Sequence, residues 1–111
     1  MLIRGATREW PPEPGQVDCF SKDLVTSAET GAMSAHHLRI EPGGLFKCHA
    51  HDRETELHFM ISGYGRALLG DSWVDMKPGD VVLTLPGVPH AFQNNTSEPI
   101  FILCVFSPPL Y

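Results

Sequence analysis

Short runs of alternating apolar and polar residues, separated by turns rich in glycine and proline, fill most of the chain. Alternation with a period of two places successive side chains on opposite faces of a strand, so these runs predict β-strands. Turns that recur at this spacing are typical of a closed barrel or a sandwich, and about eight to ten strands are expected. The clearest predicted strands cover residues 34–40, 45–51, 56–62, 66–69, 72–77, 81–85, 91–94 and 99–106.

The first third of the chain differs from the rest, because residues 1–33 hold a proline-rich stretch and only weak periodicity. We expect an extended N-terminal arm with one or two edge strands that belongs to the same domain. Residues 34–111 are expected to form the barrel itself. Within this part, Pro42-Gly43-Gly44 predicts a turn between two strands.

Two predicted strands carry more apolar side chains than one barrel interior can cover. Residues 101–106 are apolar on both faces. Residues 56–62 place Glu56 and His58 on one face and a row of apolar side chains on the other, where they would form an exposed patch. We expect a homodimer to cover these surfaces, with the N-terminal arm of the same chain as the alternative. The apolar row is Leu57, Phe59 and Ile61.

Composition limits the classes of function. The chain of 111 residues has 13 acidic and 8 basic residues and a net charge of -5. It has no cluster of lysine or arginine, which argues against nucleic acid as a partner and favours a small-molecule substrate. Its three cysteines are widely spaced and lack a CxxC pair, so we expect a reducing cytoplasm. No apolar run approaches the ~20 residues of a membrane span, and we expect no membrane partner.

Four residues have the chemistry and the spacing of a mononuclear metal site. His49 and His51 are two apart on a predicted strand, so both imidazoles leave one face and can converge on an ion at roughly 2.1 Å per bond. Residues 52–55 must then reverse the chain for Glu56 to join from the neighbouring antiparallel strand. His90 follows a turn stiffened by two prolines. Four protein ligands leave about two positions open in an octahedral shell, as a reactive site requires.

The residues around these four resemble the two motifs of the cupin family. Gly43-x5-His49-x-His51-x4-Glu56-x6-Gly63 matches the first motif, and residues 79–87 with 90–94 match the second. One departure is Leu85, where the family often has proline, although Pro86 follows directly. The resemblance covers about residues 34–107. It implies the cupin jelly-roll barrel, or double-stranded β-helix, and one divalent transition metal (Fe, Mn, Ni or Zn) held by His49, His51, Glu56 and His90.

Two alternatives to this ligand set remain open. The histidines are polar barrel residues without a metal in cupins that have lost the site. Cys48 could join His49 and His51 in a structural zinc site, but its opposite parity on the strand predicts that it points out of the pocket as a small buried apolar residue.

Strand parity predicts in which direction the side chains of the remaining histidines point. His58 lies two residues after Glu56 on the same face, and we regard it as the candidate catalytic residue, either a general base or a group that orients Glu56; a structural role is the alternative. His36 is expected to point inward as a core histidine, whereas His37 is expected to be solvated. Met60, Phe92 and Phe106 are expected as core residues or apolar pocket walls.

This pattern favours a metal-dependent enzyme that acts on a small organic compound. With Fe(II) the chemistry would be that of a dioxygenase, and with Mn, Ni or Zn the ion would act as a Lewis acid for an isomerase, lyase or decarboxylase. The alternative is a non-enzymatic module that binds a small ligand, as in the sensory part of a regulator. The same ligand set serves many chemistries on one fold, so these hypotheses stay open at the level of sequence.

Overall fold

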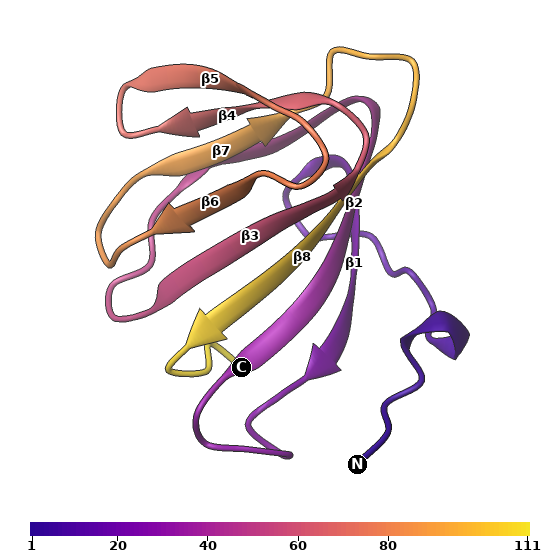
Figure 1. Cartoon of the computed structure of the whole chain (residues 1–111), viewed down its shortest axis with the longest axis vertical. Coiled ribbons are helices and arrows are strands. Elements are labelled where there is room, and N and C mark those ends of the chain that lie inside the picture. The colour runs from indigo at the N-terminus through magenta and orange to yellow at the C-terminus, as the bar shows by residue number, and fades with distance from the viewer.

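The computed structural model describes the whole chain, Met1–Tyr111, and consists almost entirely of antiparallel strands (Figure 1). The predicted all-β fold is therefore confirmed. The one helical element is a single 3-10 turn, η1 (Gly5–Thr7), and no helix is long and apolar enough to cross a membrane. The strands are β1 (Val17–Val25), β2 (Ser34–His49), β3 (Thr55–Ser62), β4 (Gly65–Leu69), β5 (Ser72–Met76), β6 (Val81–Thr84), β7 (His90–Gln93) and β8 (Ile100–Ser107).

The strands form one sheet that curls on itself, in the order β5-β4-β7-β2-β8-β3-β6, with β1 paired to β2. In Figure 1, β5, β4 and β7 lie above β3, β8, β2 and β1, so the sheet folds into two layers. Strand β2 belongs to both layers because it pairs with β8 along its first half and with β7 along its second. The curl brings strands that are distant in the sheet order around a common interior.

The turn predicted at Pro42-Gly43-Gly44 is wrong, because β2 runs through it as one strand of 16 residues. The backbone N–H of Gly43 donates to the Asn94 carbonyl, and the Asn94 N–H donates in turn to the Gly44 carbonyl. These bonds to a distant segment replace the local bonds of a tight turn. Gly43 has a φ of +80°, which glycine adopts at little cost, and the strand bends here between the two layers.

The hydrophobic core fills one part of the interior and leaves the rest to polar side chains. Leu38, Ile40, Met60, Ile100 and Ile102 are fully buried in one cluster. Met60 therefore packs in the core and does not line the cavity described below. Along β3 the burial alternates, with polar Glu56 and His58 inside and Leu57 and Phe59 outside, so this strand presents its polar face to the interior.

The N-terminal arm covers only one of the two outer surfaces expected to need cover. The Trp10 ring packs on His37 and Phe101, with ring centroids 4.7 and 5.9 Å away. His37 is thus half-buried under the arm, and the prediction that it is solvated is wrong because Trp10 lies over it. The outer side chains of β3 stay exposed, at 37% for Leu57 and 39% for Phe59.

Candidate metal centre

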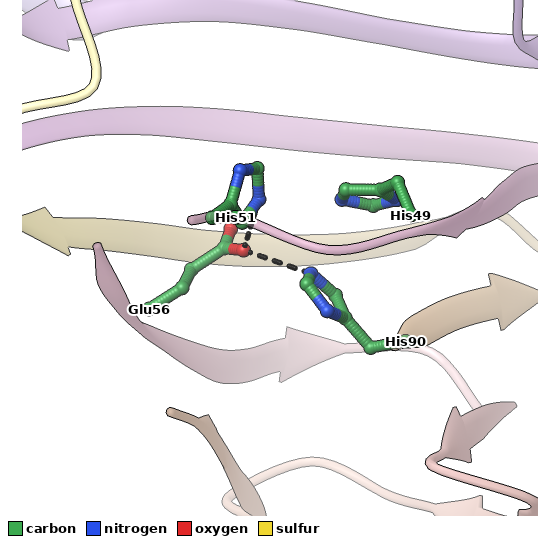
Figure 2. Close-up of side chains that lie close together, drawn as sticks. All are labelled: His49, His51, Glu56 and His90. Carbon is green, nitrogen blue, oxygen red and sulfur yellow. Dashed lines mark hydrogen bonds and ion pairs between the residues drawn. The ribbon is translucent and has the colours of Figure 1, made fainter. Parts of the chain in front are cut away.

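Four side chains from three strands and one loop converge at the open part of the interior (Figure 2). His49 ends β2, Glu56 is the second residue of β3 and His90 begins β7, directly paired with His49. His51 lies in the loop after β2, although the sequence predicted it within the strand. The loop is held there because the His51 carbonyl accepts a hydrogen bond of 2.7 Å from the Gly87 N–H. We call these four residues the His/Glu cluster.

Glu56 reaches the cluster by a different route from the one that the sequence predicted. Strand β3 is not a neighbour of β2, because β8 lies between them in the sheet. The loop of residues 50–54 instead joins the end of β2, which pairs with β7, to the start of β3, which pairs with β8, and the curl of the sheet lets Glu56 face His49 and His51 across the interior. The predicted convergence is thus present in the structure, whereas the predicted pairing of adjacent strands is wrong.

The four ligand atoms lie within 4.8 Å of one another. Around an octahedral ion with bonds of about 2.1 Å, ligands on opposite sides are about 4.2 Å apart. The cluster therefore has nearly the dimensions of a metal shell.

One carboxylate oxygen lies at the centre of the imidazoles. Oε1 of Glu56 is 3.0 Å from Nε2 of His58, 3.1 Å from Nε2 of His90 and 3.3 Å from Nε2 of His51. The His51 contact lacks the geometry of a hydrogen bond, so its buried Nε2 has no hydrogen-bond partner. Figure 2 shows the His51 and His90 rings turned toward this oxygen.

The hydrogen bonds at the Nδ1 atoms determine which ring nitrogens carry a hydrogen. Nδ1 of His90 lies 3.0 Å from the Val88 carbonyl and Nδ1 of His49 lies 2.8 Å from the Lys47 carbonyl. A carbonyl oxygen only accepts, so each Nδ1 carries the hydrogen, and a neutral imidazole then has a bare lone pair at Nε2. The lone pair of His90 faces a carboxylate oxygen. This arrangement needs either a proton or a metal cation between the two atoms.

The pKa shifts in the cluster follow from burial and from these contacts. Burial acts to raise the pKa of Glu56, but the contacts with His51, His58 and His90 outweigh it and hold that pKa well below the ordinary value, so Glu56 is a carboxylate. Burial acts to lower the pKa of His90, and Glu56 outweighs it and raises that pKa. For His49, burial and the neighbouring imidazoles lower the pKa, which leaves this ring neutral.

The donor set therefore fits a divalent transition metal. It offers a neutral imidazole at His49, an unpartnered nitrogen at His51, an ionised carboxylate at Glu56 and a His90 nitrogen oriented by its backbone hydrogen bond. Imidazole and carboxylate together suit Fe, Mn, Ni and Zn. The backbone carbonyls at Nδ1 fix the ring orientation of His49 and His90, as the partners of metal-bound histidines do.

His58 lies beside the cluster and is almost completely buried. Its Nε2 contacts Glu56 and its Nδ1 lies 3.2 Å from the Val82 carbonyl. The predicted position on the Glu56 face of β3 agrees with the structure. Cys48 points away from the cluster and is exposed, so it is not the buried apolar residue that parity predicted.

The His/Glu cluster opens into a cavity of about 530 Å³. Phe46, Phe92 and Phe106 form apolar parts of its wall, and His36 lines it as expected for an inward-facing residue. Sequence reasoning missed the side chains that β1, the preceding segment and the end of the chain contribute. They are Glu13, Gln16, Ser21, Asp23, Leu110 and Tyr111.

Strand parity could have identified two of these missed residues. Ser21 pairs with Leu38 and Asp23 pairs with His36, so they share the inner face of β2 once the pairing of β1 with β2 is known. Tyr111 had no comparable signal, because its hydroxyl meets His36 from a segment without strand periodicity.

Comparison with known proteins agrees with this fold and site. A family model described as "Cupin domain" matches residues 36–106. An uncharacterized protein of Methanocaldococcus jannaschii is 31% identical over 61 residues, which cover 55% of this chain and 49% of that protein. The chain thus spans about half the length of the curated relative it matches.

Three solved structures have nearly the same backbone at low sequence identity. KdgF from a Halomonas species gives a TM-score of 0.84 at 17% identity, over 97% of this chain and 93% of that one. A predicted oxalate decarboxylase from Thermotoga maritima gives 0.82 at 22%, over 97% and 99%. The polyketide cyclase RemF from Streptomyces resistomycificus gives 0.84 at 19%, over 96% and 78%. At these identities the likeness establishes the fold.

Proposed function

The chain belongs to the cupin family, and from that premise we propose that it is a mononuclear metal-dependent enzyme acting on a small organic compound. One observation carries the proposal. Nε2 of His51 is buried without a partner, and Nε2 of His90 faces Glu56 while Nδ1 keeps the ring hydrogen. A divalent cation among these atoms would give each of them a partner. His49, His51, Glu56 and His90 would be its ligands.

The names of the similar structures do not select one reaction. A predicted oxalate decarboxylase and a polyketide cyclase share this backbone, so the reaction would depend on the cavity and the ion and not on the barrel. An ion held by these four residues would supply either Lewis-acid polarisation or one-electron chemistry. Dioxygenase activity and isomerase, lyase or decarboxylase activity are thus the reaction classes to assay.

The side chains around the His/Glu cluster would orient the substrate, exclude water and transfer a proton. Glu56 and His90 are almost fully buried, and three phenylalanines line the cavity beside them. His58 has its Nδ1 on the Val82 carbonyl, which leaves Nε2 toward Glu56 and the cavity. His58 Nε2 would take up or deliver the proton of a bound substrate.

Metal analysis of protein purified without an affinity tag tests this proposal. We expect about one ion per chain in the wild type, and most of it lost in His51→Ala because a ligand is removed. His58→Gln should keep the metal and lose turnover of a substrate found by oxygen-uptake and product screens. His37→Gln, which changes a histidine under Trp10 outside the cavity, is the matched control. Equal metal content in wild type and His51→Ala would contradict the proposal.

A further inference from the structure

The charges in the cavity wall are all of one sign. Glu13, Asp23 and Glu56 line the cavity, and no lysine or arginine does. The Ser21 hydroxyl donates to Oε2 of Glu13 at 2.5 Å, so these side chains form one surface, which we call the acidic wall (Glu13, Ser21 and Asp23). The arginine-carboxylate pairs of the chain, Arg39 with Glu41 and Arg66 with Asp75, lie elsewhere. The two carboxylates of the acidic wall are therefore not neutralised by an ion pair.

Basic residues near this wall are held outside the cavity. Nζ of Lys22 lies 4.3 Å from the centre of the Trp10 ring, and the Arg39 guanidinium lies 4.9 Å from the same ring. Both side chains leave the outer faces of β1 and β2. Arg8 donates to the backbone carbonyl of Asp23 and not to its carboxylate. The wall therefore stays negative on the cavity side.

A ligand meets charges of opposite sign in the two parts of this cavity. A divalent ion in the His/Glu cluster would carry more positive charge than the single negative charge of Glu56 and would attract an oxygen donor. The acidic wall would attract a cation and repel a carboxylate or phosphate. Leu38, Phe46 and Phe92 offer apolar contact to the body of the ligand. Glu13 is half-buried, where such interactions are stronger than in water, whereas Asp23 is exposed and solvent weakens its contribution.

We propose that the cavity takes a small organic amine that directs an oxygen donor to the His/Glu cluster and its ammonium group to Glu13 and Asp23. This proposal rests on the proposed function, because the ion of the cluster anchors the oxygen. It names the substrate class for the site: an amine with an aromatic or aliphatic body, and not an organic acid.

Three phenols that differ only in the charged end of a short side chain test the proposal. They are tyramine, a cation; tyrosol, which is neutral; and 4-hydroxyphenylacetate, an anion. Binding to the zinc-loaded full chain is measured by calorimetric titration at neutral pH. We expect tyramine to bind about tenfold more tightly than 4-hydroxyphenylacetate, with tyrosol between them. The double variant Glu13→Gln with Asp23→Asn should remove most of that preference, whereas Asp71→Asn, in an exposed turn outside the cavity, should retain it.

The same titrations on protein stripped of metal separate this proposal from the metal proposal. The acidic wall is unchanged there, so the preference for tyramine over the anion should persist while overall affinity falls. Metal content, measured on the same samples, reports on the His/Glu cluster alone. Tighter or equal binding of 4-hydroxyphenylacetate, binding of none of the three phenols, or an unchanged preference in the double variant would overturn the amine proposal.

Discussion

Nδ1 of His36 and the hydroxyl oxygen of Tyr111 lie 2.7 Å apart, so one hydrogen bond at the cavity wall joins residues separated by 75 positions. His36 points inward, as parity on β2 predicted, and it lines the cavity as a half-buried residue with a hydrogen-bond partner and not as part of the hydrophobic core. The Tyr111 ring packs near Phe106 and closes the wall beside it. The contact ties the end of the chain to the interior of the barrel.

The His36 contact predicts a pH dependence of stability. Burial lowers the pKa of His36 from its ordinary 6.5, against the opposing effect of Glu56, Glu13 and Asp23. The folded protein thus binds this proton more weakly than the unfolded chain, and the stabilisation is full above pH 6.5 and lost as the pH falls below it. Chemical denaturation at a series of pH values measures the unfolding free energy. Its decrease as the pH falls should be smaller in His36→Gln than in the wild type. Parallel curves for the two proteins would contradict this.

Loss of the Tyr111 hydroxyl should weaken the fold slightly. Tyr111→Phe keeps the ring contact and removes the partner of His36 Nδ1, so we expect a loss of about 1 kcal/mol in unfolding free energy. Tyr64→Phe is the matched control, because Tyr64 is exposed and its ring lies outside this cavity. Equal denaturation midpoints for the two variants would show that the His36 hydrogen bond contributes nothing.

Metal affinity should fall as the pH is lowered. Glu56 raises the pKa of His90 above its ordinary value, against the effect of burial, so a proton competes for Nε2 already above pH 6.5. For each proton that the metal must displace, the metal affinity falls about tenfold per pH unit below that pKa. Zinc competition titrations between pH 8 and 5.5 would measure the slope, with about one such proton expected from His90. The control His37→Gln should have the same slope, and a flat profile would exclude His90 as a ligand.

The outer surface of β3 and β6 predicts self-association. Leu57 pairs with Leu83 and Phe59 with Val81, and all four side chains point outward at 37 to 58% exposure. We propose that a second copy of the chain covers this face, because the N-terminal arm packs on Phe101 and not here. Light scattering should give a dimer for the wild type and a monomer for Leu83→Asp. Val74→Asp, an exposed apolar position on β5, should remain dimeric; a monomeric wild type would refute the proposal.

Glycine substitutions should separate backbone strain from steric conflict. Gly63 has a φ of +87°, and a Cβ there would lie 2.5 Å from the Pro99 carbonyl oxygen. Gly70 has a φ of +66° and open space around it. We expect Gly70→Ala to cost about 1 kcal/mol of unfolding free energy from φ alone, and Gly63→Ala to cost at least about twice as much. Similar losses of unfolding free energy in the two variants would mean that the backbone at Pro99 shifts readily to make room for the Cβ.

Parity within single strands predicted the parts of the site that depend on local geometry. It placed Glu56 and His58 on one face of β3 and His36 inward, whereas His51 meets His49 from a loop to which strand parity does not apply. It did not predict how the chain travels between strands, because that depends on pairing partners far away in sequence. The bend at Gly43 is held by Asn94, and a local pattern of proline and glycine cannot distinguish such a bend from a turn.

The acidic wall illustrates the same limit. Ser21 and Asp23 enter the cavity because β1 pairs with β2 in a register that includes shifts near both of its ends. Between these shifts the register is regular from Cys19 to Asp23, so parity places Ser21 and Asp23 on the inner face once the partner of β1 is known. The sequence alone does not reveal that β2 is this partner, although the residues of β1 contribute to the charge of the cavity.

Strand β3 carries the candidate ligand Glu56 and the outward Leu57 and Phe59 within eight residues. A rigid strand cannot shift one face without shifting the other, so any movement of Glu56 on binding also moves the surface at which copies of the chain would meet. Occupancy of the interior and the strength of the proposed association would thus be mechanically coupled through a single backbone. A slip of one residue would exchange the two faces and abolish both.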